Sequence, residues 1–123
     1  MAISTDTGAT QVTVQLSDCG ESDADAVFTA LGSAFASDRA PDQHPHTTPG
    51  THPTVWSSVF DVSQTVGDPA PAELQGAVNA EVQGGIQAVH LLEDALRRAF
   101  TVEEEGVVAG DQEREVQLSL RSR

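Results

Sequence analysis

Apolar and polar residues alternate close to the start of the chain. Val12, Val14 and Leu16 are separated by threonine and glutamine, and the polar residues 17–20 follow, ending in a glycine. A period of two is typical of a strand that buries one face, and a polar stretch with glycine is typical of a turn. The pattern therefore predicts a first strand over residues 10–16 that ends in a turn.

Between residues 22 and 37 the apolar residues recur every three or four positions. This spacing aligns them along one side of an α-helix, so we predict a helix of about four turns here. The residues of its apolar face are Ala24, Val27, Phe28, Leu31, Ala34 and Phe35.

A second strand is predicted over residues 54–64. Trp56, Phe60 and Val62 fall on one face of this strand, together with Ser58. Large aromatic side chains on one face of a strand favour packing against a helix, so this face is expected to point into the core.

The C-terminal residues predict a β-hairpin. Val116, Leu118 and Leu120 alternate with polar residues, which indicates a strand over residues 113–121. Its partner strand is predicted over residues 101–108, with the turn near residues 109–111, where a glycine stands.

Residues 72–100 contain the most regular apolar pattern, and we predict one long helix there. At 1.5 Å rise per residue this helix is roughly 40 Å long, which is more than a compact domain of this size needs. Either Gly84 and Gly85 interrupt it, as a hinge or a close backbone approach, or its far end packs on another subunit. The residues of its apolar stripe are Leu74, Val78, Val82, Gly85, Val89, Leu92 and Leu96.

These elements predict a small single α+β domain with the order β-α-β-α-β-β. An antiparallel or mixed sheet is expected to pack on two helices, one of them long. We assign residues 10–123 to this domain and residues 1–9 to a flexible N-terminus. Residues 38–53 contain four prolines and three histidines and are predicted to form a loop.

The composition changes this picture in one respect, because the apolar content is low. Apolar residues make up 38% of the 123 residues, and aromatic residues only 4%. A core this light, together with the long apolar stripe, favours completion by a second subunit. The sequence therefore predicts a homodimer.

Charge narrows the choice of partners. The formal net charge is −13, and all six cations are arginines. An anionic surface repels phosphate backbones and anionic lipids, so neither nucleic acid nor membrane is an expected partner. Solubility explains the acidity most simply, and adaptation to salt is a second explanation. One cysteine, no long apolar run and no signal-peptide pattern favour the cytoplasm.

Three histidines in the predicted loop are the candidates for a metal site. His44, His46 and His52 lie within nine residues, and imidazole is a common zinc ligand. The proline between His44 and His46 stiffens this stretch, and no further ligand motif follows. We therefore predict no metal or cofactor and keep the three histidines as an alternative.

A polar row beside the apolar stripe is the preferred candidate site. His90 is the expected general acid or base, with Glu93 to orient it. Asn79 and Gln83 suit an amide group of a ligand, and Arg97 suits a carboxylate. The competing interpretation is a solvated helix flank.

Trp56 and Cys19 are the two other residues whose side chains bear on a candidate site. We predict that Trp56 is one of the ligand-binding residues. Cys19 is a poor nucleophile candidate, because the acidic neighbours Asp18 and Glu21 oppose a thiolate.

The function hypothesis follows from this row. We expect a small dimeric protein that binds a small molecule or peptide in a groove between helix and sheet. Its enzymatic form is a cofactor-independent acid–base tailoring enzyme that cyclises, isomerises or cross-links a natural product or ribosomal peptide. The alternative is a non-catalytic interaction or regulatory partner, and the second alternative is a metal-binding protein.

Overall fold

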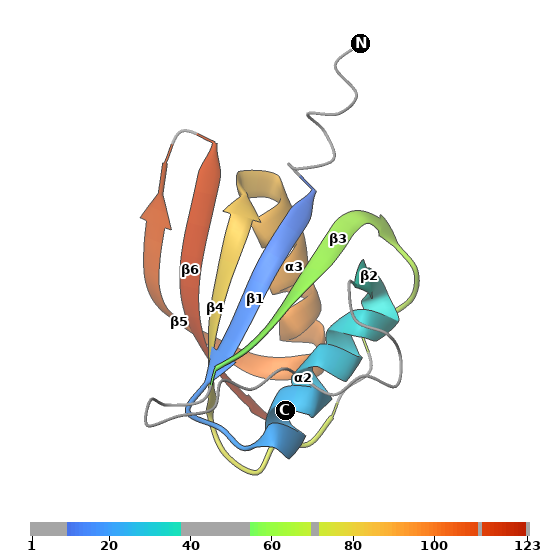
Figure 1. Cartoon of the computed structure of the whole chain (residues 1–123), viewed down its shortest axis with the longest axis vertical. Coiled ribbons are helices and arrows are strands. Elements are labelled where there is room, and N and C mark those ends of the chain that lie inside the picture. The colour runs from blue at the N-terminus through green and yellow to red at the C-terminus, as the bar shows by residue number, and fades with distance from the viewer. Residues whose placement is uncertain (1–9, 38–54, 70–71, 111, 123) are drawn as a thin grey trace.

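Six antiparallel strands form one sheet in the order β2-β3-β1-β4-β6-β5 (Figure 1). The computed structural model describes residues 10–37, 55–69, 72–110 and 112–122. The elements are β1 (Gln11–Ser17), α2 (Glu21–Ala34), β2 (Phe35–Ser37), β3 (Trp56–Thr65), β4 (Val78–Gly85), α3 (Ile86–Ala99), β5 (Phe100–Ala109) and β6 (Glu113–Ser122).

One face of the sheet is apolar and packs against the two helices. Figure 1 shows α3 behind β1 and β4, and the rings of Phe28 in α2 and Phe60 in β3 lie 6.1 Å apart. Alternation along each strand puts every second side chain on this face, which builds the core. The buried residues on it are Val12, Val14 and Leu16 in β1, Trp56, Phe60 and Val62 in β3, Val78, Ala80 and Val82 in β4, and Val116, Leu118 and Leu120 in β6.

The predicted helix over residues 72–100 is wrong in its first part. Strand β4 occupies Val78–Gly85, and α3 begins only at Ile86. Val78 and Val82 are four residues apart, and this spacing places two residues on one face of a helix and also of a strand. The segment is a strand because its backbone forms hydrogen bonds with both β1 and β6. Both partner strands lie far away in the sequence.

Gly84 lies where the predicted long helix is interrupted, and a glycine is needed there because the backbone of β1 comes very close. A Cβ atom at this position would lie 2.7 Å from the carbonyl oxygen of Gln11 and 3.3 Å from the Cα of Val12. Only glycine leaves room for β1 to pair this closely with β4. Gly85 then serves as the N-cap residue of α3.

The segment before β4 has no helical hydrogen bonds because side chains from distant elements bind its backbone. The carboxylate of Asp23, buried at the start of α2, accepts the N–H of Gln75 at 3.0 and 3.1 Å. The hydroxyl of Ser122 accepts the N–H of Leu74 at 2.6 Å and donates to its carbonyl at 3.1 Å. These bonds tie the segment to α2 and β6.

The predicted α+β class, with an antiparallel sheet packed on two helices, is confirmed. The first strand, the strand around Trp56 and the C-terminal hairpin also lie where the pattern predicts them. The first helix ends earlier than predicted, at Ala34, because Phe35–Ser37 pair with β3 as strand β2. Residues 1–9 and the whole of the loop 38–53 lie outside the described residues. Neither of the two described helices has the length and apolar character of a membrane-spanning helix.

The apolar stripe that motivated the homodimer is covered within the chain. Val78 and Val82 point from β4 into the core, and Val89, Leu92 and Leu96 point into the same core from α3. The physical reason for expecting a partner along this stripe is thereby removed. The homodimer itself stays a prediction.

Candidate functional site

No helix of the described residues covers the outer face of the sheet. Along β4, the buried residues Val78, Ala80 and Val82 alternate with partly or fully exposed polar residues, Asn79, Glu81 and Gln83. Strands β1 and β3 alternate in the same way, so polar side chains from neighbouring strands stand together on one open surface.

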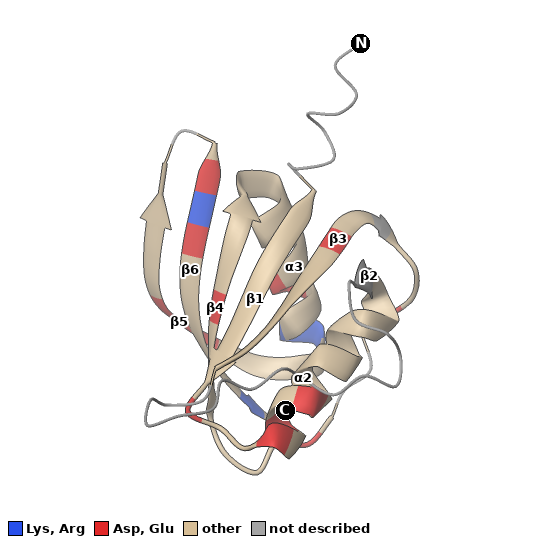
Figure 2. Ribbon diagram, in the orientation of Figure 1, with Lys and Arg blue, Asp and Glu red and all other residues tan. Residues whose placement is uncertain are grey.

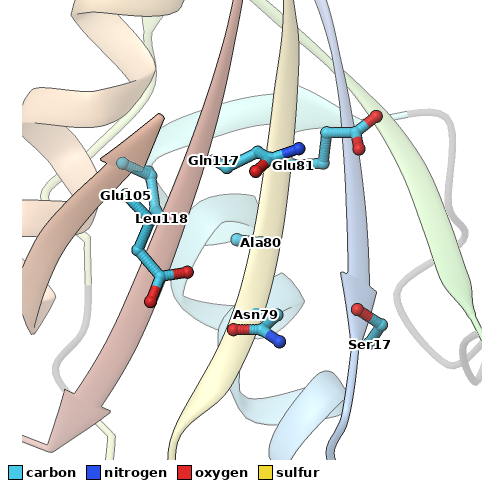
Figure 3. Close-up of a pocket in the computed structure, with 7 residues that line it drawn as sticks. All are labelled: Ser17, Asn79, Ala80, Glu81, Glu105, Gln117 and Leu118. Atoms are coloured by element: carbon cyan, nitrogen blue, oxygen red, sulfur yellow. The ribbon is translucent and has the colours of Figure 1, made fainter. Parts of the chain in front are cut away.

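A hollow of about 210 Å³ lies on this outer face (Figure 3). It crosses the sheet from β1 to β5, and most of its side chains point away from the helices. The lining residues are Ser17, Asn79, Ala80, Glu81, Glu105, Gln117 and Leu118.

Strand register brings these side chains together. Asn79 pairs with Ser17 on β1, and Glu81 pairs with Gln117 on β6. Directly opposed residues in antiparallel strands point to the same face, so the two pairs form adjacent rows. Glu105 joins them from β5, where the register shifts between Glu104 and Gly106.

Asp18 places a carboxylate next to Asn79, one of the lining residues of the hollow. It adopts a left-handed backbone conformation (φ 58°) in the turn after β1, which aspartate tolerates better than most residues. Its carboxylate accepts a hydrogen bond from the side-chain amide of Asn79. This bond fixes the orientation of the Asn79 side-chain amide, and so also the direction of its carbonyl oxygen.

The hollow is an acceptor-rich, anionic surface. Glu81 and Glu105 contribute two carboxylates, and no ion pair joins either of them to an arginine within the part of the chain described. The described arginines all lie on α3 and β6 (Figure 2). Such a surface is complementary to a cation that donates hydrogen bonds.

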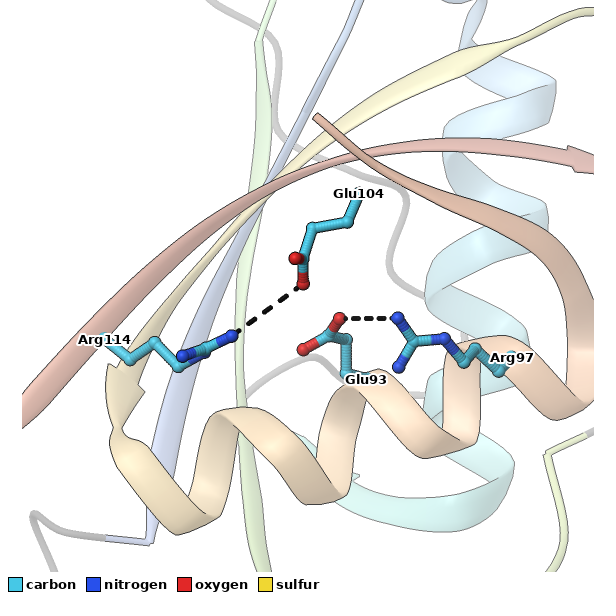
Figure 4. A network of polar contacts seen from close by, with 4 residues as sticks. All are labelled: Glu93, Arg97, Glu104 and Arg114. Atoms are coloured by element: carbon cyan, nitrogen blue, oxygen red, sulfur yellow. Dashed lines mark hydrogen bonds and ion pairs between the residues drawn. The ribbon is translucent and has the colours of Figure 1, made fainter. Parts of the chain in front are cut away.

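A second cluster of charges lies on the opposite side of the sheet, between α3 and the β5–β6 hairpin (Figure 4). Arg97 donates a hydrogen bond to Glu93 at 3.0 Å, and the Glu93 side chain is only 2% exposed. Arg114 and Glu104 form an ion pair at 3.8 Å. The Nε of Arg114 is buried and has no hydrogen-bond partner among the described residues.

Burial raises the pKa of Glu93, and it is the largest effect on this carboxyl. The charge of Arg97 opposes the rise, the hydrogen bond and charge of Glu104 add to it, and the charge of Arg114 opposes it again. A buried carboxyl beside a second carboxyl holds its proton more readily than an exposed one. Glu93 therefore holds its proton more readily than an exposed glutamate, in a cluster that also contains Glu104 and the guanidinium groups of Arg97 and Arg114.

The structure separates the predicted site residues into two groups. Glu93 and Arg97 meet in the inner cluster, whereas Asn79 and Gln83 lie on β4 and point to the outer face. The side chain of His90 is exposed on α3, and no hydrogen bond or ion pair joins this imidazole to another described residue. The predicted row is thus not assembled, because its first two members belong to a strand and not to the helix.

The surroundings of Trp56 do not suit ligand binding, and those of Cys19 do not suit a nucleophile. Trp56 is 5% exposed in the core, and its buried Nε1 has no hydrogen-bond partner in the described part of the chain. Burial, followed by the charges of Asp23 and Asp18, raises the pKa of the Cys19 thiol to about 11. Cys19 is therefore a thiol at neutral pH and a weak nucleophile.

The metal alternative falls outside the described residues. His44, His46 and His52 belong to residues 38–54, which the structure does not describe. Within residues 10–37, 55–69, 72–110 and 112–122, no group of three histidine, cysteine, aspartate or glutamate side chains could hold a metal ion.

Three residues that line the hollow are not among the candidates predicted from the sequence: Glu81, Glu105 and Gln117. The alternation of polar and apolar residues could have identified two of them, because Glu81 alternates with the apolar residues of β4 and Gln117 with those of β6. Assigning β4 to a helix concealed the first of these, and the register shift at Glu105 has no clear sequence signature.

Comparison of the chain with protein families, curated proteins and solved structures finds no significant match. The functional proposal therefore depends on the geometry of the chain itself.

Proposed function

We propose that this protein is a non-catalytic interaction module that binds a lysine or arginine side chain of a peptide or protein partner. The binding position is the hollow on the outer face of the sheet. The observation behind the proposal is the combination of an uncovered sheet face with a hollow that contains two carboxylates without an ion-pair partner among the described residues.

The size and chemistry of the hollow suit a single cationic side chain. A volume of about 210 Å³ accommodates a guanidinium or ammonium head with part of its stem. Glu81 and Glu105 supply charge-assisted acceptors, and the side chains of Asn79 and Gln117 supply neutral acceptors. The net charge of −13 attracts a basic partner over a longer range and speeds its encounter.

The test uses N-acetyl-arginine amide as the probe and N-acetyl-glutamine amide as its neutral counterpart. In NMR titrations, the side-chain amide signals of Asn79 and Gln117 should shift with the arginine compound and stay in place with the glutamine compound. Glu81→Gln should weaken binding roughly 5- to 10-fold, the loss of one charge-assisted hydrogen bond.

Asp94→Asn is the matched control, because Asp94 is exposed on α3 and the change in net charge is the same. This variant should bind like the wild type. If both variants weaken binding equally, only the overall charge attracts the cation, and the hollow is not the binding position.

A second candidate function, acid–base tailoring chemistry without a cofactor, is favoured by one observation. Glu93 is buried, its pKa is raised, and it lies beside a second carboxyl, Glu104. Perturbed carboxyl pairs are a common feature of acid–base sites, although structural ion networks also perturb carboxyls. His90, exposed one turn before Glu93, is the accompanying base in this hypothesis.

Native mass spectrometry of the purified protein separates the two candidates. A retained small molecule that is lost in Glu93→Gln but kept in Glu81→Gln supports the tailoring enzyme. The same spectrum reports whether the protein is the proposed homodimer. The cytoplasm is the proposed compartment, since the single cysteine, Cys19, is a free thiol and the fold needs no disulfide.

A further inference from the structure

Strand β5 forms one edge of the sheet over its full ten residues (Figure 1). On one side it pairs with β6 from Phe100 to Ala109, and on its other side no strand of the described residues pairs with it. The opposite edge, β2, has only three residues. A long edge strand offers a row of backbone N–H and C=O groups to an added strand.

The charges on β5 restrict what can pair with it. Glu103, Glu104 and Glu105 are consecutive and exposed, and the strand contains no lysine or arginine. Antiparallel pairing of two copies about this region would set these carboxylates against one another. Like charges in opposed positions destabilise a strand pair, whereas opposite charges stabilise it.

The three glutamates are divided between the two faces. Glu104 pairs with Leu118 in the register, so it points to the helix side, where it contacts Arg114. Glu103 pairs with Ser119 on the outer face, and Glu105 lines the outer hollow. The carboxylates left for a partner therefore lie mainly on the outer face.

Two valines complete the exposed surface of this edge. Val107 is 41% exposed and pairs with Val116, so it points to the helix side, and Val108 is 68% exposed. An added strand with alternating basic and apolar residues would direct its basic side chains to Glu103 and Glu105. Its apolar side chains would then cover Val107 on the other face.

We infer that an extended basic segment of a protein partner adds to the sheet along the free edge of β5. This inference rests on the proposed function, because it specifies how the basic partner binds, and Glu105 belongs to both surfaces. Main-chain hydrogen bonds to β5 supply the binding, and the alternation of basic and apolar side chains supplies the selectivity.

The probe for this inference is the peptide acetyl-Val-Arg-Val-Arg-Val-Arg-amide. Two derivatives are compared with it, one N-methylated at the valines and one N-methylated at the arginines. In an antiparallel pair, alternate residues direct their N–H groups to the neighbouring strand and to solvent. One derivative should lose at least about tenfold in affinity through lost main-chain bonds, and the other should lose much less.

Hydrogen exchange locates the peptide on the protein. Slower exchange of the β5 amides, without change in β2, is the expected result. Glu103→Gln combined with Glu105→Gln should weaken binding, and Asp94→Asn should not. Equal affinity of all three peptides overturns the inference, and so does protection in β4 without protection in β5.

The same measurements keep the two proposals distinguishable. If methylation has no effect while Glu81→Gln weakens binding, the hollow stands and the added strand is wrong. If one methylated peptide fails while Glu81→Gln binds normally, the added strand stands and the hollow is wrong. Sedimentation that shows a dimer, together with slower exchange of the β5 amides in the peptide-free protein at high but not at low protein concentration, also overturns the inference, because a second copy of the chain then occupies this edge.

Discussion

Glutamates lie on both faces of the sheet, in contrasting surroundings. On the helix side, Glu93 is 2% exposed, hydrogen-bonded to Arg97 and close to Glu104. On the outer side, Glu81 and Glu105 line a hollow and form no ion pair with the described arginines. The inner carboxyl is engaged within the fold, whereas the outer carboxylates are open to a partner.

The difference in burial determines which carboxyl groups of a small domain are available to bind a partner. A buried carboxyl has lost its hydration, and its neighbours decide whether it keeps its proton. An exposed carboxylate keeps its charge at neutral pH and costs the fold little. The same residue type is therefore an element of structure on one face and an available acceptor on the other.

The largest expected effect compares two adjacent residues of β6. Leu118 points its side chain into the core, and its neighbour Gln117 points to the outer face. Leu118→Ala should lower the free energy of unfolding by about 2–5 kcal/mol, since it removes buried methyl groups and leaves a cavity. Gln117→Ala should change it by no more than about 0.5 kcal/mol. Urea denaturation of both variants checks this, and similar losses would contradict the two-face description.

The next effect concerns the contact between β1 and β4. Gly84→Ala should lower the free energy of unfolding by about 1–3 kcal/mol, because the added methyl group would lie 2.7 Å from the Gln11 carbonyl oxygen. Gly32→Ala is the control, since nothing lies within 4 Å of a Cβ there and the residue is in helix α2. That variant should gain up to about 1 kcal/mol. Thermal unfolding of the pair distinguishes the outcomes.

A smaller effect is expected in the pH dependence of stability, to which the buried carboxyl of Glu93 contributes. The pKa of Glu93 is raised from its ordinary value of 4.5 in the folded protein, so the folded state binds its proton more tightly than the unfolded state. The stability from this proton is fully present below pH 4.5 and is lost as the pH rises through the folded-state pKa.

Glu93→Gln removes this dependence, so the stability of the variant relative to the wild type should increase between pH 4 and pH 8. Denaturation at several pH values measures the difference, with Asp94→Asn as a control that should keep the wild-type slope. An opposite slope would mean that the Arg97 and Arg114 charges outweigh burial.

The smallest effect on stability is expected on the outer face. Glu81→Gln should change the free energy of unfolding by no more than about 0.5 kcal/mol, because Glu81 has no ion-pair partner among the described residues. A loss above about 1 kcal/mol would show that Glu81 supports the fold, as Glu93 is tied into it, and the contrast between the faces would disappear.

Alternation along the chain was sufficient to predict most of the sheet. In β1, β3 and β6 the apolar residues are large and regularly spaced, so only a strand places them on one face. Around Leu92 the helix was equally clear, because Val89, Leu92 and Leu96 fit no period of two. For the candidate site, only Asn79 of the predicted residues lines the hollow.

The α+β class, the apolar faces and the acidic character follow from local periodicity and charge along the chain. The strand at Val78–Gly85 follows instead from tertiary pairing, because a spacing of four residues fits both periods and Ala80 is too small to mark the alternation. Pairing with β1 and β6 provides hydrogen bonds to this backbone from residues that lie 28–42 positions away along the chain in β6 and 62–72 positions away in β1. The same pairing sets Asn79, Glu81 and Gln117 side by side, which no local pattern specifies.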